Sequence, residues 1–340
     1  MKRAAAIQYF IWLVLAGLLL WLSLRVLTPP EGQNRWDYLI SAWRRTDKAW
    51  LWLMALLAMV SHLIRAERWR LLLGVSGQPV SFFHALLSLL VGYLINLVIP
   101  RGGEISRCLN LYKLNSYPAD KSFGTVVAER AIDLMCFLLV LVIAFFVEFD
   151  KLAAFVKTLP VELPGKPAMW LWMVALALFI VVIIVLRLFV KRFPALQNKL
   201  SQLWKGFLSG LRSIRYVRQP GLFITYSILI WLLYFLMTYA VLMAFEETRS
   251  LGWQAILNLF AIGSLAMVLP MPGGTGSYHT LVPAGLSFLY GLNLPDAVAF
   301  TFVFHAWQTL IMIAGGVPAL LTTLMLGTGK KIENTLPLEP

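Results

Sequence analysis

Apolar segments long enough to cross a lipid bilayer dominate the sequence, and they leave few folds open to it. A transmembrane helix needs about 20 predominantly apolar residues. Only 13% of the residues are charged, whereas about 25% is usual in a soluble domain. We therefore expect an all-α, polytopic integral membrane protein. The six spanning helices that we predict lie at about 4–27, 49–66, 122–147, 168–190, 221–245 and 296–326.

The first apolar segment follows Lys2 and Arg3, as the core of a signal peptide would. A signal core is usually shorter than this segment, and no small-residue cleavage site precedes Pro29 and Pro30. We expect the segment to remain as an uncleaved first helix. The stretch 28–48 is predicted to be a loop of mixed charge.

The net charge of +13 comes from Lys and Arg residues that lie between the apolar segments. This placement argues against nucleic-acid binding, because the positive-inside rule predicts basic cytoplasmic loops. Arg65, Glu67, Arg68 and Arg70 end the second segment, and we interpret Glu67 and Arg68 as charges at the membrane interface. The pattern predicts a multi-pass protein of the bacterial inner membrane with both termini in the cytoplasm.

The linker 191–218 holds seven Lys or Arg residues and no acidic residue. Its apolar residues repeat at helical spacing, with the basic residues off the apolar stripe. This pattern predicts a basic amphipathic helix on the anionic inner leaflet, and the alternative is a solvated helix packed on other loops. After the last segment, we expect 327–340 to be a flexible tail.

Two further apolar segments, 81–118 and 252–292, are interrupted by glycine-rich turns. The first contains GYLINLVIPRGGEISR and the second contains GSLAMVLPMPGGTGSYH, so each has a proline and then Gly-Gly. Proline removes a helical hydrogen bond, and glycine allows a sharp turn. We predict two broken, re-entrant hairpins, the first entering from the cytoplasm and the second from outside. The second hairpin could alternatively form two full spans.

The order of helix, hairpin and helix occurs twice with opposite orientation, over 49–147 and 221–326. We therefore predict an inverted repeat within a single transmembrane domain, 1–326, arranged as an eight-segment bundle. Interrupted helices at corresponding places of two such halves indicate a binding site between them.

Each break starts a helix inside the membrane, and the free N–H groups and dipole of a helix start favour an anion. A phosphate is the obvious anion in a membrane, and arginines and hydroxyls near the breaks would assist it. The alternative is that both breaks are only packing kinks. The substrate-binding residues that we predict at the breaks are Arg101, Gly102, Gly103, Glu104, Arg107, Gly273, Gly274, Thr275 and Ser277.

Glu129, Arg130 and Asp133 form a second charged group inside an apolar segment. The two carboxylates are four residues apart and share a helix face. A charge at membrane depth costs at least ~2.5 kcal/mol unless it is paired or hydrated, so we predict a substrate-binding role for all three. The alternative is a structural ion pair with one of the nearby bases Arg101, Arg107 or Lys121.

No nucleotide-binding loop, catalytic triad or metal-ligand spacing is visible in the sequence, so we expect no catalysis and no cofactor. The glycines at 273–276 are not a P-loop, because no Lys follows them. We interpret His279 and His305, which have apolar neighbours, as packing residues.

Four segments together resemble the lysylphosphatidylglycerol synthase transmembrane-region family, also described as flippase-like. They are ERWRLLL from Glu67, GYLINLVIPRGGEISR from Gly92, FGTVVAERAIDL from Phe123 and MPGGTGSYH from Met271. The resemblance covers about 8–325 and implies an eight-segment lipid translocase fold. In the multiple peptide resistance factor of this family, the membrane half moves aminoacylated phosphatidylglycerol and a synthase domain follows. We expect a stand-alone member without that domain.

The leading hypothesis is a lipid translocase that moves a phosphate-bearing or aminoacylated phospholipid, or a lipid-linked precursor, between leaflets. Its partners would be the lipid head group and the anionic inner leaflet, with a homo-oligomer as a further option. The alternatives are a non-transporting membrane subunit of an envelope lipid assembly, or an integral-membrane lipid transferase. The absence of an ATP-binding motif predicts passive or ion-coupled transport.

Overall fold

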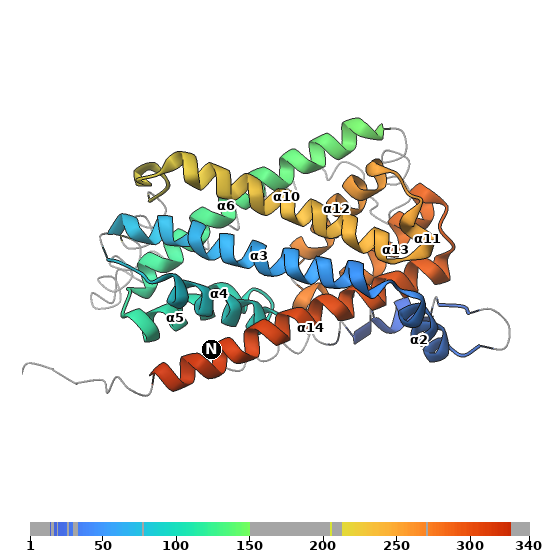
Figure 1. Ribbon diagram of the computed structural model, residues 1–340, viewed down its shortest axis with the longest axis horizontal. Coiled ribbons are helices and arrows are strands. Elements are labelled where there is room, and N and C mark those ends of the chain that lie inside the picture. The colour runs from blue at the N-terminus through green and yellow to red at the C-terminus, as the bar shows by residue number, and fades with distance from the viewer. Residues whose placement is uncertain are drawn as a thin grey trace, which may run out of the picture.

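The computed structural model describes residues 14, 17–18, 20–25, 27–29, 33–76, 78–149, 205, 213–269 and 271–327. Within these residues every regular element is a helix, so the all-α prediction is confirmed. The predictions for 4–27, 168–190, 191–218 and 327–340 fall largely outside the described residues. The main helices (Figure 1) are α2 Arg35–Arg45, α3 Lys48–Leu73, α4 Phe82–Asn96, α5 Gly102–Asn115, α6 Ala119–Val147, α10 Pro220–Ala244, α12 Trp253–Val268, α13 Ser277–Tyr290 and α14 Leu294–Gly327.

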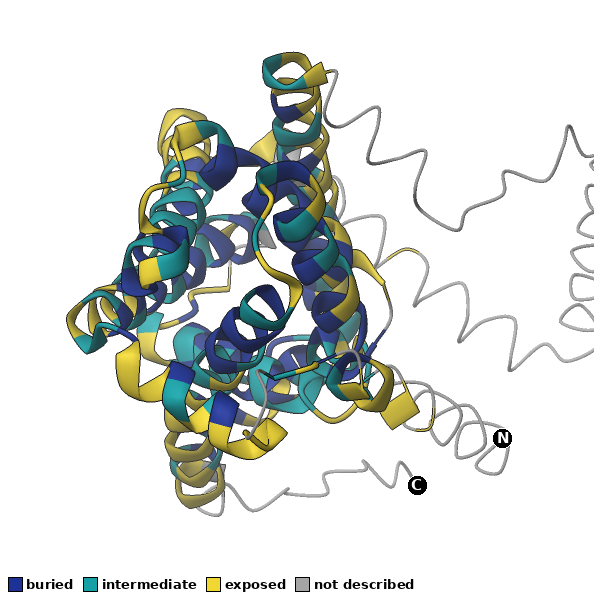
Figure 2. Cartoon of the chain, turned by 90° about the vertical axis from the view of Figure 1, so that its right-hand side faces the viewer, coloured by how far each residue is buried: buried dark blue, intermediate teal, exposed yellow. Residues whose placement is uncertain are grey.

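Four helices of the described part of the chain are long and apolar enough to cross a membrane: α3, α6, α10 and α14. They correspond to four of the predicted spans. Seen end-on (Figure 2), buried residues face the middle of the bundle, whereas many exposed ones lie outside. Large apolar side chains are among these exposed residues, as expected for surfaces in contact with lipid. The chain is therefore a multi-pass membrane protein.

The prediction of a loop over 28–48 is wrong, because α2 lies within it. Asn34 caps the helix start by accepting a hydrogen bond from the backbone N–H of Asp37, at 2.9 Å, which satisfies one of the free amides there. On the inner face of α2, the Tyr38 hydroxyl donates a hydrogen bond to Asp296 at the start of α14. Burial and this carboxylate raise the pKa of Tyr38 to about 12.

Each interrupted segment folds into a pair of packed helices, α4 with α5 and α12 with α13. Glycines let the first pair approach closely, since a Cβ on Gly103 would lie 2.2 Å from the carbonyl oxygen of Gly92. In the second pair, a Cβ on Gly263 would lie 3.1 Å from the Tyr278 ring. Figure 1 shows the two pairs toward opposite ends of the bundle.

The contacts between elements follow a matched pattern. Helix α3 packs on α10, α4 packs on α14, and α6 packs on α12. Each hairpin thus contacts a long helix from the other half of the chain. The pattern places the two glycine-rich turns next to each other.

The two turns touch directly. Arg101, which has the left-handed φ of 57°, donates from Nη2 to the carbonyl oxygen of Val268 at 3.0 Å. A Cβ built on Gly273 would lie 3.3 Å from the Leu97 side chain. The end of α12 and its following turn therefore rest on the turn between α4 and α5.

Candidate functional site

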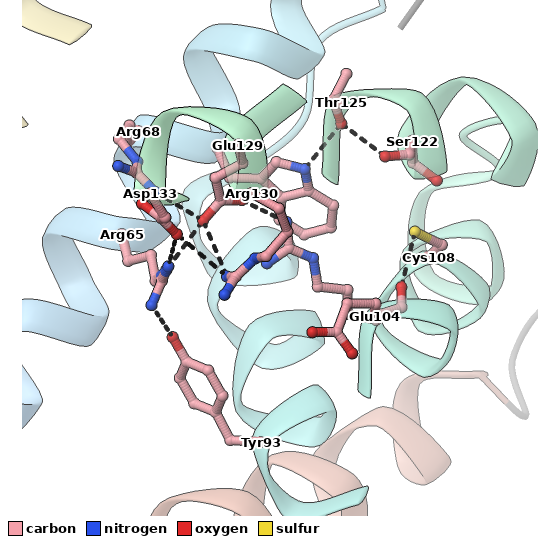
Figure 3. Close-up of polar contacts among 12 residues, drawn as sticks. Arg65, Arg68, Tyr93, Glu104, Cys108, Ser122, Thr125, Glu129, Arg130 and Asp133 are labelled. Atoms are coloured by element: carbon pink, nitrogen blue, oxygen red, sulfur yellow. Dashed lines mark hydrogen bonds and ion pairs between the residues drawn. The ribbon is translucent and has the colours of Figure 1, made fainter. Parts of the chain in front are cut away.

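Two arginines of α3 face two carboxylates of α6 in the interior (Figure 3). Arg65 donates from Nε to Glu129 Oε1 at 2.9 Å and also pairs with Asp133. Arg68 Nη2 lies 3.0 Å from Glu129 Oε1 and 2.7 Å from Asp133 Oδ1. The spacing of three and four residues on the two helices brings these side chains onto facing surfaces.

Arg107 of α5 and Arg130 of α6 complete the ion cluster, which we define as Arg65, Arg68, Arg107, Glu129, Arg130 and Asp133. Arg107 pairs with Glu129, and its guanidinium lies 4.3 Å above the centre of the Trp69 ring. Arg130 Nη2 is 3.6 Å from a carboxylate oxygen of each acid. Helices α3, α5 and α6 therefore meet at one charged centre.

Neutral polar groups from two more helices join this centre. Arg65 Nη1 donates to the hydroxyl of Tyr234 on α10 at 2.6 Å, and lies 3.4 Å from the hydroxyl of Tyr93 on α4. Arg68 Nη1 lies 3.2 Å from Ser227 Oγ on α10. The ion cluster is thus held from both halves of the chain.

The ion cluster contains four guanidinium groups and two carboxylates, which leaves a formal excess of two positive charges. The Nε atoms of Arg68, Arg107 and Arg130 are buried and have no hydrogen-bond partner among the described residues. A buried donor without a partner costs about 1–3 kcal/mol. What the ion cluster lacks, by charge and by hydrogen bonding, is a further anionic acceptor.

The ion cluster lies well inside the membrane-spanning helices. Arg65 precedes the end of α3 by eight residues and Glu129 follows the start of α6 by ten. These separations correspond to about 12–15 Å along a helix. A charge at such depth costs free energy unless it is paired, and the carboxylates of the ion cluster neutralise only part of its positive charge.

The structure brings together four of the sequence-predicted residues, Arg107, Glu129, Arg130 and Asp133. Of the predicted ion-pair partners, Arg107 does pair with Glu129. Arg101 is not at the ion cluster, because its side chain turns to the carbonyl of Val268. Glu104 makes no ion pair within the described residues, and its Oε2 is buried without a hydrogen-bond partner.

The prediction of free amides is wrong for the first two residues of α5. The N–H of Gly103 donates to Asn96 Oδ1 at 2.7 Å, and that of Gly102 donates to the carbonyl of Ile99. In the second turn, the N–H groups of Gly274 and Thr275, which precede α13, donate to backbone carbonyls three residues earlier. These amides stabilise their own turns.

Ser277 is also occupied, because its hydroxyl oxygen lies 2.8 Å from the carbonyl oxygen of Ala266 and 3.2 Å from that of Gly274. Among the described residues, no hydrogen bond or ion pair joins Gly273, Gly274, Thr275 or Ser277 to the ion cluster. The second turn is therefore a separate feature of the structure.

Arg65 and Arg68 were not among the residues predicted from the sequence to bind substrate. The interpretation of Arg68 as an interface charge is wrong, since its side chain is 0% exposed. The run of leucines at 71–73 could have revealed this, because it extends α3 and moves both arginines further inside. Glu67, by contrast, pairs with Arg70 at the half-exposed end of the helix.

Comparison with known proteins identifies one protein family that matches this chain. The family model described as "Lysylphosphatidylglycerol synthase TM region" matches residues 5–316. A UPF0104 membrane protein of Pyrococcus horikoshii is 24% identical over 311 residues, which cover 85% of this chain and 89% of the relative. One from Methanothermobacter thermautotrophicus is 25% identical over 299 residues, covering 82% and 87%.

A shorter match, to a UPF0104 membrane protein of Methanocaldococcus jannaschii, is 32% identical over 116 residues and covers 33% of this chain and 34% of the relative. No solved structure matches the chain at a significant level.

Proposed function

Because the chain belongs to the lysylphosphatidylglycerol synthase TM region family, we propose that it moves a phosphate-bearing lipid between the two leaflets of the membrane. The cargo is a phospholipid, aminoacylated or not, or a lipid-linked precursor, and no chemical reaction takes place. The observation that carries the proposal is the buried excess of positive charge, with Nε atoms on Arg68, Arg107 and Arg130 that have no partner in the described part of the chain.

A lipid phosphate supplies what the ion cluster lacks. Guanidinium groups bind phosphate oxygens through a planar fork of donors, and the Nε atoms are part of that fork. Arg130 is the entry point in this proposal, because its side chain is 40% exposed whereas those of Arg68 and Arg107 are 0% and 4% exposed. The acyl chains remain in the bilayer, against the exposed apolar faces of the helices.

The architecture that we propose is an inverted repeat in which α3–α6 corresponds to α10–α14. The matched contacts of α4 with α14 and of α12 with α6 support it. The α4–α5 and α12–α13 pairs are then re-entrant hairpins that enter from opposite membrane faces. The basic end of α3 faces the cytoplasm of a cell with the protein in its inner membrane, and both termini lie on that side.

The test is lipid exchange in liposomes that contain the purified protein and a fluorescently labelled lipid. We expect faster exchange of anionic phospholipids than in protein-free liposomes, and at least a tenfold loss with Arg130→Gln. Arg70→Gln is the matched control, because Arg70 is comparably exposed and pairs with Glu67 outside the ion cluster. Exchange of every anionic lipid at the protein-free rate would overturn the proposal.

The same preparation distinguishes the alternatives. Tight retention of anionic lipid without exchange would favour a non-transporting membrane subunit, acting alone or as an oligomer at the anionic leaflet. Conversion of the labelled lipid into a new product would instead indicate a transferase.

A further inference from the structure

Tyr278 and His305 occupy the place in the second half of the chain that the Arg107–Glu129 ion pair occupies in the first, and His279 directly follows Tyr278. Alignment of the two Gly-Gly pairs puts Tyr278 and His279 opposite Arg107 and Cys108. Alignment of Asp120 with Asp296, each near the start of a long helix, puts Glu129 opposite His305 and Thr125 opposite Thr301. The first half thus has fixed charges at this place, and the second half has groups that can gain a proton.

The two imidazole rings lie edge to face in the interior. Their centres are 4.7 Å apart, and the residues are 4% and 8% exposed for His279 and His305. The ring of Tyr278 lies 5.6 Å from that of His305, and the ring of Phe302 lies 4.4 Å from that of His279. The pair is therefore enclosed by aromatic side chains.

Each histidine makes a hydrogen bond to the backbone of the second glycine-rich turn. His305 Nε2 lies 3.0 Å from the carbonyl oxygen of Gly273, and since a carbonyl only accepts, Nε2 carries the hydrogen. His279 Nδ1 accepts from the N–H of Gly276 at 3.4 Å, so Nδ1 is without a proton. The tautomers of both rings follow from these partners.

A proton affects the two contacts differently. His305 can accept one at Nδ1 and still donate from Nε2 to Gly273. His279 can accept one only at Nδ1, where it loses the hydrogen bond from Gly276 and turns two N–H groups toward each other. Two protonated imidazoles at this separation would also repel each other.

Within the described part of the chain, no acidic side chain contacts His279 or His305 to balance the charge of an added proton. Helices α12 and α13 contain no Asp, Glu, Lys or Arg, and the other titratable group in contact is the Tyr278 phenol. On α14, Asp296 precedes His305 by nine residues, about 13 Å along the helix. Arg101, which contacts the end of α12, would repel a positive charge.

We propose that His279 and His305 form a proton-binding site whose occupation releases the second turn from the first. With both rings neutral, the turn at Gly273–Gly276 is held in place. Gly273 lies against Leu97 of the first turn, and Arg101 bonds the carbonyl of Val268 at the end of α12. A bound proton breaks the contact between His279 and Gly276 and frees the turn to move away. This inference concerns the conformation of the hairpins and does not depend on which lipid, if any, is carried.

The experiment measures the distance between the two turns as a function of pH. Spin labels on Val98→Cys and Val268→Cys report it, because both side chains are exposed, at 52% and 45%, and flank the contact. The protein carries Cys108→Ala and Cys136→Ala so that only these sites are labelled. A titration from about pH 8 to about pH 5 spans the ordinary pKa of histidine. We expect a second, longer distance population to grow as the pH falls.

The decisive variant combines His279→Asn and His305→Gln. The Asn oxygen replaces the Nδ1 acceptor and the Gln amide replaces the Nε2 donor, but neither side chain binds a proton. This variant should keep the short distance across the whole range. His84→Gln is the matched control, since His84 lies near the start of α4 and contacts Asn115, and it should respond like the parent protein.

A distance in the parent protein that does not change with pH would overturn the proposal, and so would an unchanged pH response in the double variant. If the double variant does not fold at about pH 8, His305→Gln alone takes its place, with a reduced response expected and an unchanged response overturning the proposal. Because the readout is a distance, a failure of lipid exchange leaves this result interpretable.

Discussion

Arg107 of α5 and Glu129 of α6 form an ion pair whose side chains are 4% and 0% exposed. The pair ties the first hairpin to the long helix that follows it. Glu129 is also shared by Arg65 and Arg68 of α3, so one carboxylate joins three helices. The stability of this half of the molecule should therefore depend strongly on that single negative charge.

Replacing Glu129 by Gln should destabilise the protein by about 3–5 kcal/mol, because it leaves buried arginines without their main counter-charge. Thermal unfolding in detergent measures the change. Glu67→Gln on α3 is the control, since Glu67 and Arg70 form a pair about one-third exposed, and such pairs contribute about 0–1 kcal/mol. Equal effects of the two substitutions would show that the charge of Glu129 is not structural.

Gly103→Ala should destabilise the first hairpin by at least about 1–3 kcal/mol, the usual cost of overpacking. The new Cβ would lie 2.2 Å from the backbone oxygen of Gly92, and backbone atoms cannot turn aside as a flexible side chain can. Gly221→Ala is the control in the first turn of α10, where nothing lies within 4 Å of the added atom. It should be neutral or stabilising by up to about 1 kcal/mol. A harmless Gly103→Ala would mean that the hairpin arms can separate.

Anionic phospholipid should raise the Tm of the detergent-solubilised protein more than a zwitterionic lipid at the same concentration. Binding to the folded state alone contributes about 2.7 kcal/mol when the ligand is at 100 times its Kd. Arg130→Gln should reduce the difference between the two lipids, because it removes the most accessible guanidinium of the ion cluster. Equal Tm shifts with both lipids would count against an anion site.

Tyr38 should make stability fall at high pH. Its pKa is raised to about 12 by burial and by Asp296, so the folded state favours the neutral phenol. This contribution is fully present below about pH 10, the pKa of an unperturbed tyrosine, and is lost as the pH rises through about 12. Unfolding of the parent protein and of Tyr38→Phe should therefore converge between these two pH values. A constant difference across that range would contradict the assignment.

The helices were predictable from the sequence where the pattern was local. Apolar length located α3, α6, α10 and α14, and the proline and glycine pairs located both turns. Helix α2 was missed because its signal is a polar cap rather than an apolar run. Asn34 before the helix and Asp37 in its first turn are that signal.

The site was only partly predictable, because the partners of each charge come from distant parts of the chain. Spacing placed Glu129 and Asp133 on one face, but nothing local showed that Arg68, rather than Arg101, would meet them. The bonded amide of Gly103 is a similar case. Its acceptor, Asn96, lies across the turn, and only the folded hairpin shows that the two groups meet.

The contact between the two glycine-rich turns couples the position of one hairpin to that of the other. Leu97 fills the space beside Gly273, and Arg101 is hydrogen-bonded to the end of α12. A displacement of either hairpin should therefore displace the other through this contact. Packed elements of this kind switch between discrete arrangements rather than deform smoothly, so the two ends of the bundle should change shape in step.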